Sequence, residues 1–136
     1  MLFRSLVSHL LATSGVHVVR ELHATRPVLI NRQELQQVMV NLLVNALHAM
    51  PGGGTLRLST RDADGGVVEL EVADSGPGLS PERLRDLFQP FATGKKDGTG
   101  LGLWISRGIV ERYGGDIAVA NRAGAVFTVR LKAEGA

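Results

Sequence analysis

The chain has 136 residues, which is long enough for one domain with its own hydrophobic core. Its 15 basic and 13 acidic residues leave a net charge of +2, too small to support nucleic-acid binding by charge alone. The absence of cysteine excludes disulfides and thiolate metal sites, and no apolar run approaches the roughly 18 residues of a membrane span. We therefore expect a cytoplasmic domain that contacts neither nucleic acid nor a membrane.

The first segment, residues 1–12, is predicted to be a helix with a narrow apolar seam for a partner helix. This seam consists of Leu2, Phe3, Leu6, Val7, Leu10 and Leu11. A signal peptide is the alternative, but Ser8 and His9 interrupt the apolar run and no small-residue cleavage site follows. His9 is not followed by an acidic residue, so we interpret it as a solvated side chain.

The next elements are a strand and a long helix. The alternation over Val16–Leu22 predicts a strand, and Arg26–Pro27 closes it into a loop. A mostly apolar helix is predicted over Glu34–Met50, with Asn31 as its N-cap and Glu34 completing a capping box. The run Pro51–Gly54 ends this helix.

A polar stripe runs along the predicted central helix. Gln37, Asn41 and Asn45 follow one another at four-residue intervals, and His48 continues the same side. An unpaired amide in an apolar setting costs about 1–3 kcal/mol, so these groups need partners. Two interpretations remain open: a polar cluster satisfied by neighbouring backbone, or a site for Mg²⁺ and phosphate, because an amide oxygen is a hard, neutral ligand suited to Mg²⁺.

Two strands predicted over Thr55–Arg61 and Val67–Ala73 are joined by turn residues 62–66 as an antiparallel hairpin. The second strand continues into Asp74–Gly78, which contains two further glycines. The segment is either an ordinary turn or the edge of a purine site. In the second case Asp74 accepts a hydrogen bond from an exocyclic amine, and the glycines let the backbone approach a flat ligand.

Ser80 begins a short helix that is predicted to end near Phe88, and residues 88–97 have the composition of a lid. Gly98–Leu103 opens another helix. A dinucleotide fingerprint lacks its third glycine here and a Walker loop lacks its Gly-Lys-Ser/Thr, which leaves a helix start suited to phosphate. The expected buried face of this helix is Leu101, Trp104, Ile105, Gly108 and Ile109.

The glycine pair Gly114–Gly115 ends that helix, and two closing strands are predicted over Asp116–Ala120 and Ala125–Lys132. Residues 121–124 between them carry another hairpin signal.

Four motifs in this order resemble the N, G1, F and G2 boxes of the catalytic domain of two-component sensor histidine kinases, in the superfamily of gyrase, heat-shock-90 chaperones and MutL. They are NLLVNALHAM, DSGPG, FQPF and GTGLGL. The resemblance covers residues 16–131 and is nearest to the nitrogen-regulator type. It implies a Bergerat-type α/β fold: a two-layer sandwich with a mixed sheet of about five strands and three helices on one face. The strand count agrees with the hydrophobic pattern, whereas the topology comes from the resemblance.

The resemblance also implies roles for individual residues. Asn45 matches the Mg²⁺ ligand, Asn41 supports metal and phosphates, and Lys95 acts with them on the terminal phosphate. Asp74 matches the residue that binds the adenine amine, and Thr128 falls where the family hydrogen-bonds near adenine. The full expected ATP site is Asn41, Asn45, His48, Ala49, Asp74, Gly76, Gly78, Leu79, Phe91, Thr93, Lys95, Gly98, Thr99, Gly100, Leu101, Gly102, Leu103 and Thr128.

One position separates reaction classes within the superfamily. The residue that corresponds to Asn41 is a glutamate that activates water in the ATPase branches, and an amide cannot accept that proton. We therefore expect a kinase that uses ATP and Mg²⁺, whose partners are its own dimerisation domain with a phosphoacceptor histidine and a response regulator. Neither His9, His17, His23 nor His48 has a phosphoacceptor context.

This expectation makes the chain a catalytic fragment: residues 1–12 are a remnant of a linking helix and residues 13–136 are the ATP-binding domain. Two alternatives remain: a stand-alone serine kinase of the anti-sigma type, and a nucleotide-sensing module without catalysis.

Overall fold

The computed structural model describes residues 12, 15–89 and 102–135 of the chain. These residues contain five strands and three helices, in the order β1 (Val16–Leu22), α2 (Arg32–His48), β2 (Gly54–Ala63), β3 (Val67–Asp74), α3 (Pro81–Asp86), α4 (Gly102–Arg112), β4 (Asp116–Asn121) and β5 (Ala125–Lys132). The predicted helix over residues 1–12 lies almost entirely outside the described residues, as does the predicted lid beyond Gln89.

The five strands form one mixed sheet in the order β1-β2-β3-β5-β4. β1 pairs with β2 in parallel, and the other neighbouring strands are antiparallel. The hairpins β2-β3 and β4-β5 join neighbours in sequence, whereas α2 makes the crossover that a parallel pair requires. The expected α/β sandwich with a five-stranded mixed sheet and three helices is therefore confirmed.

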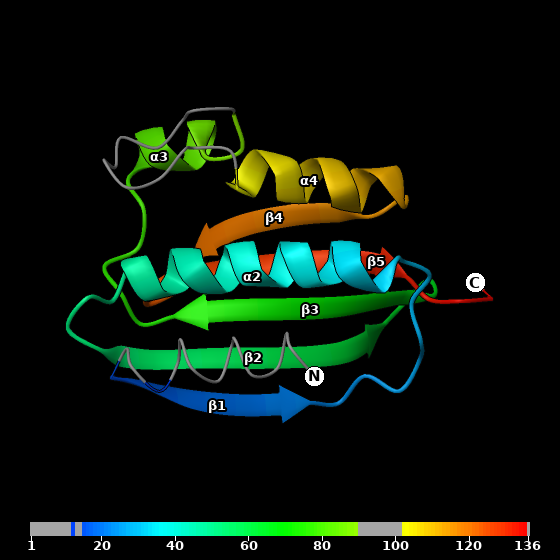
Figure 1. The fold of residues 1–136 in the computed structure, drawn as a ribbon, viewed down its shortest axis with the longest axis horizontal. Helices are drawn as coiled ribbons and strands as arrows, with labels where there is room; N and C mark the ends of the chain where they lie inside the picture. Colours follow the sequence, from blue (N-terminus) through cyan, green and yellow to red (C-terminus); the bar gives the residue numbers. More distant parts are fainter. Residues whose placement is uncertain (1–11, 13–14, 90–101, 136) are drawn as a thin grey trace.

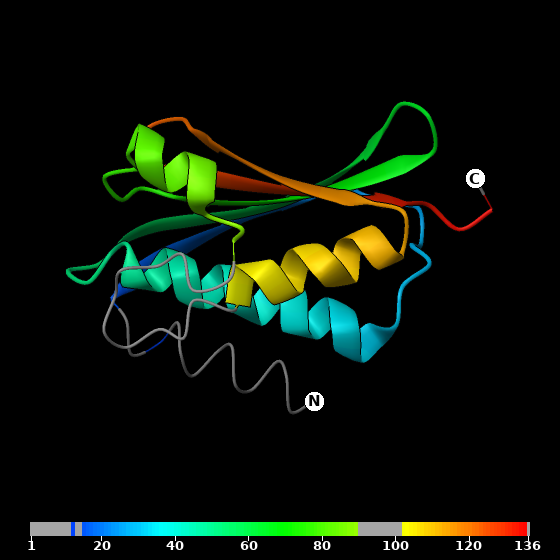
Figure 2. The same cartoon turned by 90° about the horizontal axis from the view of Figure 1, so that it is seen from above.

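α2 and α4 lie together over one face of the sheet, and α3 lies beyond β4 (Figures 1 and 2). The core is between this face and the two helices. It contains Leu42 and Leu43 of α2, Val110 of α4, and Phe127 and Val129 of β5. Phe88, just after α3, packs edge-on against Phe127 with 6.4 Å between the ring centroids, so the end of α3 is also attached to the core.

The ends of the helices follow from their capping residues. The predicted N-cap of α2 is confirmed, because the Asn31 side chain accepts a hydrogen bond from Glu34 N at 3.1 Å. The helix begins directly after this cap, at Arg32, two residues before the predicted range Glu34–Met50. Ser80 caps α3 in the same way, by accepting from Arg83 N at 3.2 Å. The Glu34 carboxylate does not complete a capping box; it pairs with Arg112 and accepts a hydrogen bond from the Tyr113 hydroxyl at the far end of α4.

The expected buried face of α4 is wrong at three positions. Trp104 and Ile105 are 49% and 38% exposed, and Gly108 is also exposed. The helix instead buries Ser106, Ile109 and Val110. The sequence contains two overlapping apolar stripes, and α4 buries the one that contains Ser106. The cost of burying the serine hydroxyl is offset by its hydrogen-bond partners inside the protein.

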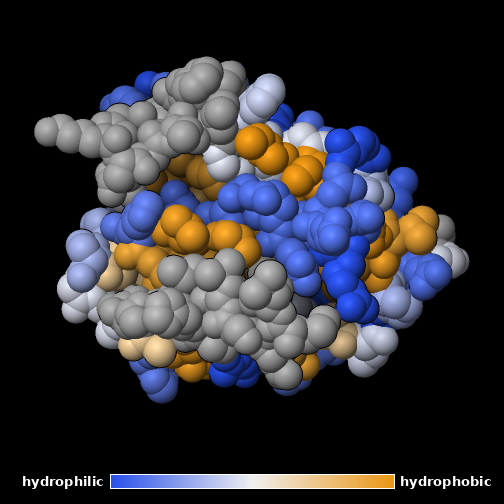
Figure 3. Space-filling view, viewed as in Figure 1, coloured by the Kyte–Doolittle hydropathy of each residue, from blue (hydrophilic) through white to orange (hydrophobic). Residues whose placement is uncertain are grey.

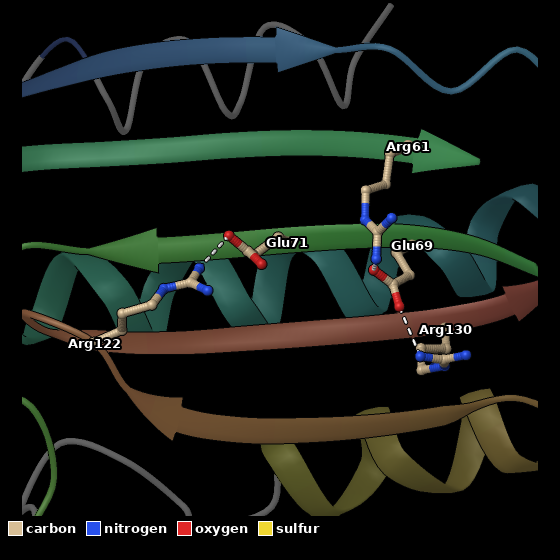
Figure 4. A network of polar contacts seen from close by, with 5 residues as sticks. All are labelled: Arg61, Glu69, Glu71, Arg122 and Arg130. Carbon is tan, nitrogen blue, oxygen red and sulfur yellow. Dashed lines mark hydrogen bonds and ion pairs between the residues drawn. The ribbon is translucent and has the colours of Figure 1, made fainter. Parts of the chain in front are cut away.

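The other face of the sheet bears charged side chains. Glu69 on β3, only 12% exposed, pairs with both Arg61 and Arg130 at 2.7 Å, and Glu71 pairs with Arg122 at 2.7 Å (Figure 4). On the helix face, hydrophilic residues gather over α2 and α4 with hydrophobic patches beside them (Figure 3). None of the described helices is long and apolar enough to cross a membrane.

Candidate functional site

Asp74, the last residue of β3, is a buried carboxylate with one oxygen in use. Its side chain is held by backbone N–H groups of Gly76 and Ala125, which donate to Oδ1 at 2.9 and 3.2 Å. The residue is only 5% exposed, and its Oδ2 is buried without a hydrogen-bond partner among the described residues. Because a buried carboxylate oxygen needs a donor, the site is suited to a ligand that supplies an N–H group.

Two glycines make this arrangement possible because the backbone passes too close for a side chain. A Cβ atom on Gly76 would lie 2.7 Å from the carbonyl oxygen of Ala49, and one on Gly124 would lie 2.0 Å from the carbonyl oxygen of Asp74. The loop after β3 therefore packs directly on the end of α2, and the β4-β5 turn packs directly on the end of β3.

The side of α2 that bears the predicted polar residues Asn41 and Asn45 connects this loop to the start of α4. Asn41, Asn45 and Ala49 lie at four-residue intervals and so share one side of the helix. At one end Asn41 lies against Gly102, the first residue of α4, and at the other Ala49 lies against Gly76. Eight residues of helix span about 12 Å, so the stripe joins two glycine-containing segments that are far apart in the sequence.

Asn41 makes three side-chain hydrogen bonds. Its Nδ2 donates to the Gly102 carbonyl and to the Ser106 hydroxyl, both at 2.9 Å, and its Oδ1 accepts from Gln37 Nε2 at 3.1 Å. The first of the two interpretations of the stripe, a polar cluster with partners in the protein, thus holds for the Asn41 nitrogen.

Asn45 differs from Asn41. Its side chain is half-buried and has no hydrogen-bond partner among the described residues, so its amide remains available to a ligand. His48 lies in the last turn of α2 and is exposed.

Gly78 and Leu79 are held by a residue that sequence reasoning did not select. The Asn121 amide, at the end of β4, accepts from Leu79 N at 2.9 Å and donates to Leu79 O at 2.7 Å. Gly78 has φ +80°, and a Cβ there would lie 2.8 Å from Asn121 Oδ1. Asn121 therefore fixes the loop that follows Asp74, although its position in a hairpin signal suggested only a turn.

The structure thus brings Asn41, Asn45, Ala49, Asp74, Gly76 and Gly102 together, with Gly78, Leu79 and Leu103 on the adjoining segments and His48 exposed at the end of α2. The other expected ligands of ATP lie outside the described residues. These are Phe91, Thr93, Lys95, Gly98, Thr99, Gly100 and Leu101.

The prediction that Thr128 belongs to this site is wrong. Thr128 on β5 is paired with Glu71 and Ala118, whereas its neighbour Phe127 is in the core below the helices. Side chains alternate between the faces of a sheet, so Thr128 lies on the face opposite the helices. The residue of β5 that contacts Asp74 is Ala125, through its backbone N–H, and no side-chain pattern could have revealed it.

Comparison with known proteins identifies the family of this chain. The family described as histidine kinase-, DNA gyrase B- and HSP90-like ATPase matches residues 30–135. The chain is 31% identical to the catalytic domain of the histidine kinase ThkA in a nucleotide-free crystal structure, with a TM-score of 0.87 over 96% of this chain and 88% of ThkA's. The chain belongs to this family, as the ATP-binding catalytic domain of a sensor histidine kinase.

Relatives of the kinase domain are parts of much longer proteins. The C4-dicarboxylate transport sensor protein DctB of Rhizobium meliloti (strain 1021) is 47% identical over 105 residues, which cover 75% of the chain and 17% of DctB. The sensor histidine kinase ZraS of Klebsiella oxytoca is 43% identical over 103 residues, 74% of the chain and 22% of ZraS. The kinase domain therefore spans about a fifth of the length of these curated relatives.

The fold also matches a structure determined with a nucleotide analogue. Full-length ShkA in complex with AMPPNP has a TM-score of 0.80 and 26% identity, over 98% of the kinase domain and 30% of ShkA.

Proposed function

We propose that this domain binds Mg-ATP and presents the terminal phosphoryl group to a histidine on the dimerisation domain of its parent kinase. The observation that carries the proposal is the buried, unpartnered Oδ2 of Asp74. The exocyclic amine of adenine is a hydrogen-bond donor of the kind this oxygen requires. Gly76, which has no room for a side chain, lets a flat base approach the carboxylate.

The α2 stripe fits a magnesium ion with phosphate ligands. Asn45 would be the metal ligand, because its amide oxygen is hard and neutral and has no competing partner among the described residues. Asn41 Oδ1 would support the metal and phosphates with the electron pair that Gln37 leaves free. The bound ion would supply charge neutralisation on the phosphates, and Lys95 is proposed to add a positive charge.

The chemistry of Asn41 favours phosphoryl transfer over hydrolysis. An amide cannot act as a general base toward water, and the Asn41 nitrogen is already committed to Gly102 and Ser106. The site would therefore hold ATP without activating water. Phosphoryl transfer depends mainly on positioning and charge stabilisation, and the acceptor histidine and the response regulator would belong to other domains or proteins.

Titration of this chain with Mg-ATP by calorimetry tests the proposal. We expect Asp74→Asn to weaken ATP binding by roughly 1–3 kcal/mol, about 5- to 150-fold, because the adenine amine loses its matched acceptor. Glu71→Gln is the matched control: it changes a carboxyl on the same strand that faces the opposite side of the sheet, and ATP affinity should be unchanged. Equal affinities for wild type and Asp74→Asn would contradict an adenine site at Asp74.

A further inference from the structure

Ser106 lies in the middle of the α2-α4 contact and is fully buried, at 0% exposure. Apart from Asp74 it is the only polar residue buried to this degree in the described part of the chain. Its hydroxyl lies 2.9 Å from the Gly102 carbonyl, one turn earlier in α4, and 2.9 Å from Asn41 Nδ2. A buried hydroxyl between the first residue of α4 and the polar stripe of α2 is placed to influence both.

The direction of each hydrogen bond follows from what the groups can donate. A carbonyl oxygen only accepts, so the hydroxyl proton of Ser106 goes to Gly102. The Ser106 oxygen must then accept from Asn41, whose second Nδ2 proton also goes to Gly102. Both amide protons of Asn41 are thereby used, and the amide cannot turn over without placing its oxygen against the Gly102 carbonyl.

This network leaves Oδ1 as the only atom of the Asn41 side chain that can serve a ligand. From it we infer that Ser106 is a positioning residue of the nucleotide site: it fixes the Asn41 amide so that Asn41 offers an oxygen to the magnesium and phosphates. This inference rests on the proposed function. Hydrogen-bond partners of metal ligands commonly orient them in this way. Without the Ser106 hydroxyl, the Asn41 nitrogen would be held by the Gly102 carbonyl alone, and the amide, with the exposed Gln37 as its other partner at Oδ1, could pivot about that bond.

The test compares Ser106→Ala with wild type in two titrations, ATP with excess Mg²⁺ and ATP with EDTA. We expect Ser106→Ala to weaken Mg-ATP binding about 10-fold, as for other outer partners of metal ligands, and to leave metal-free binding within about twofold. Tyr113→Phe is the matched control, because it removes the other hydroxyl that joins α4 to α2, at the far end of the helices. That variant should keep the Mg²⁺ response of wild type, by which we mean the ratio of the ATP affinities measured with Mg²⁺ and with EDTA.

A double variant tests whether Ser106 acts through Asn41. In an Asn41→Ala background, Ser106→Ala should produce no additional loss of Mg-ATP affinity. An unchanged Mg²⁺ response in Ser106→Ala, an equal change in Tyr113→Phe, or a full additional loss in the Asn41→Ala background would each overturn the inference. None of these results would contradict the proposed function. The proposed function fails separately if wild type does not bind ATP or if Asp74→Asn binds it as well as wild type does.

Discussion

Asn45 is a half-buried residue of α2 whose amide has no hydrogen-bond partner among the described residues, and its role is testable apart from that of the base site. We predict that Asn45→Ala weakens Mg-ATP binding by about 1.5–3 kcal/mol, roughly 10- to 150-fold, because a polar contact to a charged centre is lost. Binding of ATP in EDTA should change little. Isothermal titration under both conditions measures the difference.

The control for this variant is Gln33→Ala, which removes an exposed amide from the first turn of the same helix. It should leave both affinities unchanged. Equal losses with and without Mg²⁺ in Asn45→Ala would exclude a metal role for Asn45.

Gly124 illustrates how one backbone position can support the site from outside it. Its φ of +133° is strained for any residue with a side chain, and a Cβ would lie 2.0 Å from the Asp74 carbonyl oxygen. We predict that Gly124→Ala lowers the free energy of unfolding by more than the roughly 1–3 kcal/mol of such strain alone, because the backbone must also move. Urea unfolding measures this. Gly65→Ala, with φ +80° and open space around the Cβ, isolates the conformational part and should be the milder variant.

Single residues differ in how far the sequence alone could place them. Asp74 could be selected as a candidate from its place after an apolar strand and before two glycines, but that pattern also fits an ordinary turn, and its role near adenine came from the resemblance. Ala125 was not, because it contributes a backbone N–H, and its side chain carries no signal. Thr128 was assigned to the site only through the resemblance, whereas the face it occupies depends on the register of β5 with β3 and β4.

Among the elements, the loop between β3 and α3 owes its conformation to the end of β4. Asn121 makes two hydrogen bonds to Leu79, and an exposed pair of this kind contributes about 1–2 kcal/mol. We predict that Asn121→Ala lowers the free energy of unfolding by about that amount and also weakens ATP binding, because the loop carries Gly76 and Gly78. Asn121→Asp keeps the acceptor for Leu79 N and should lose about half as much stability. Urea unfolding and ATP titration check both effects. An ATP affinity of Asn121→Ala equal to that of wild type would contradict the prediction.

The helices show which features the hydrophobic pattern and capping residues can predict and which they cannot. The capping residues Asn31 and Ser80 placed the starts of α2 and α3 within two residues, since a cap acts through local contacts. The buried face of α4 could not be derived in the same way. The Ser106 hydroxyl is buried with two partners, Gly102 one turn earlier in α4 and Asn41 on α2, and the second of these is 65 residues away in the sequence.

For the whole molecule, strand positions follow from alternation and turn residues, but strand order does not. The two hairpins are local, whereas the parallel pairing of β1 with β2 joins Val16 to Gly54 across the whole of α2. That pairing was expected only through the resemblance to histidine kinases. The ion pairs on the sheet face opposite the helices could not be predicted either, because Glu69 pairs with arginines of two different strands.

The connection between β1 and α2 ties the edge of the sheet to both hairpins and gives the whole domain an acid-sensitive contact. His23 N donates to Thr60 O at 2.9 Å, and Glu134 N donates to Pro27 O at 2.8 Å. Asp62 accepts from the Thr25 hydroxyl at 2.6 Å and from the N–H groups of Thr25 and Arg26 at 3.2–3.3 Å. The Thr25 hydroxyl is the largest of the influences that hold the pKa of Asp62 below its ordinary value of 3.8.

Because the pKa of Asp62 is lower in the folded than in the unfolded chain, its contribution to stability is fully present above the unfolded value near 3.8. It is lost as the pH falls through the folded pKa. We predict that Asp62→Asn reduces the urea midpoint near pH 7 and that the difference from wild type shrinks below about pH 3.8. The effect should be small and should weaken with salt, since Asp62 is exposed. The control is Asp64→Asn, which changes a carboxyl in the adjoining turn that lacks these hydrogen bonds. A difference in urea midpoint between Asp62→Asn and wild type that stays constant across the acid range would contradict a link between the Asp62 charge and stability.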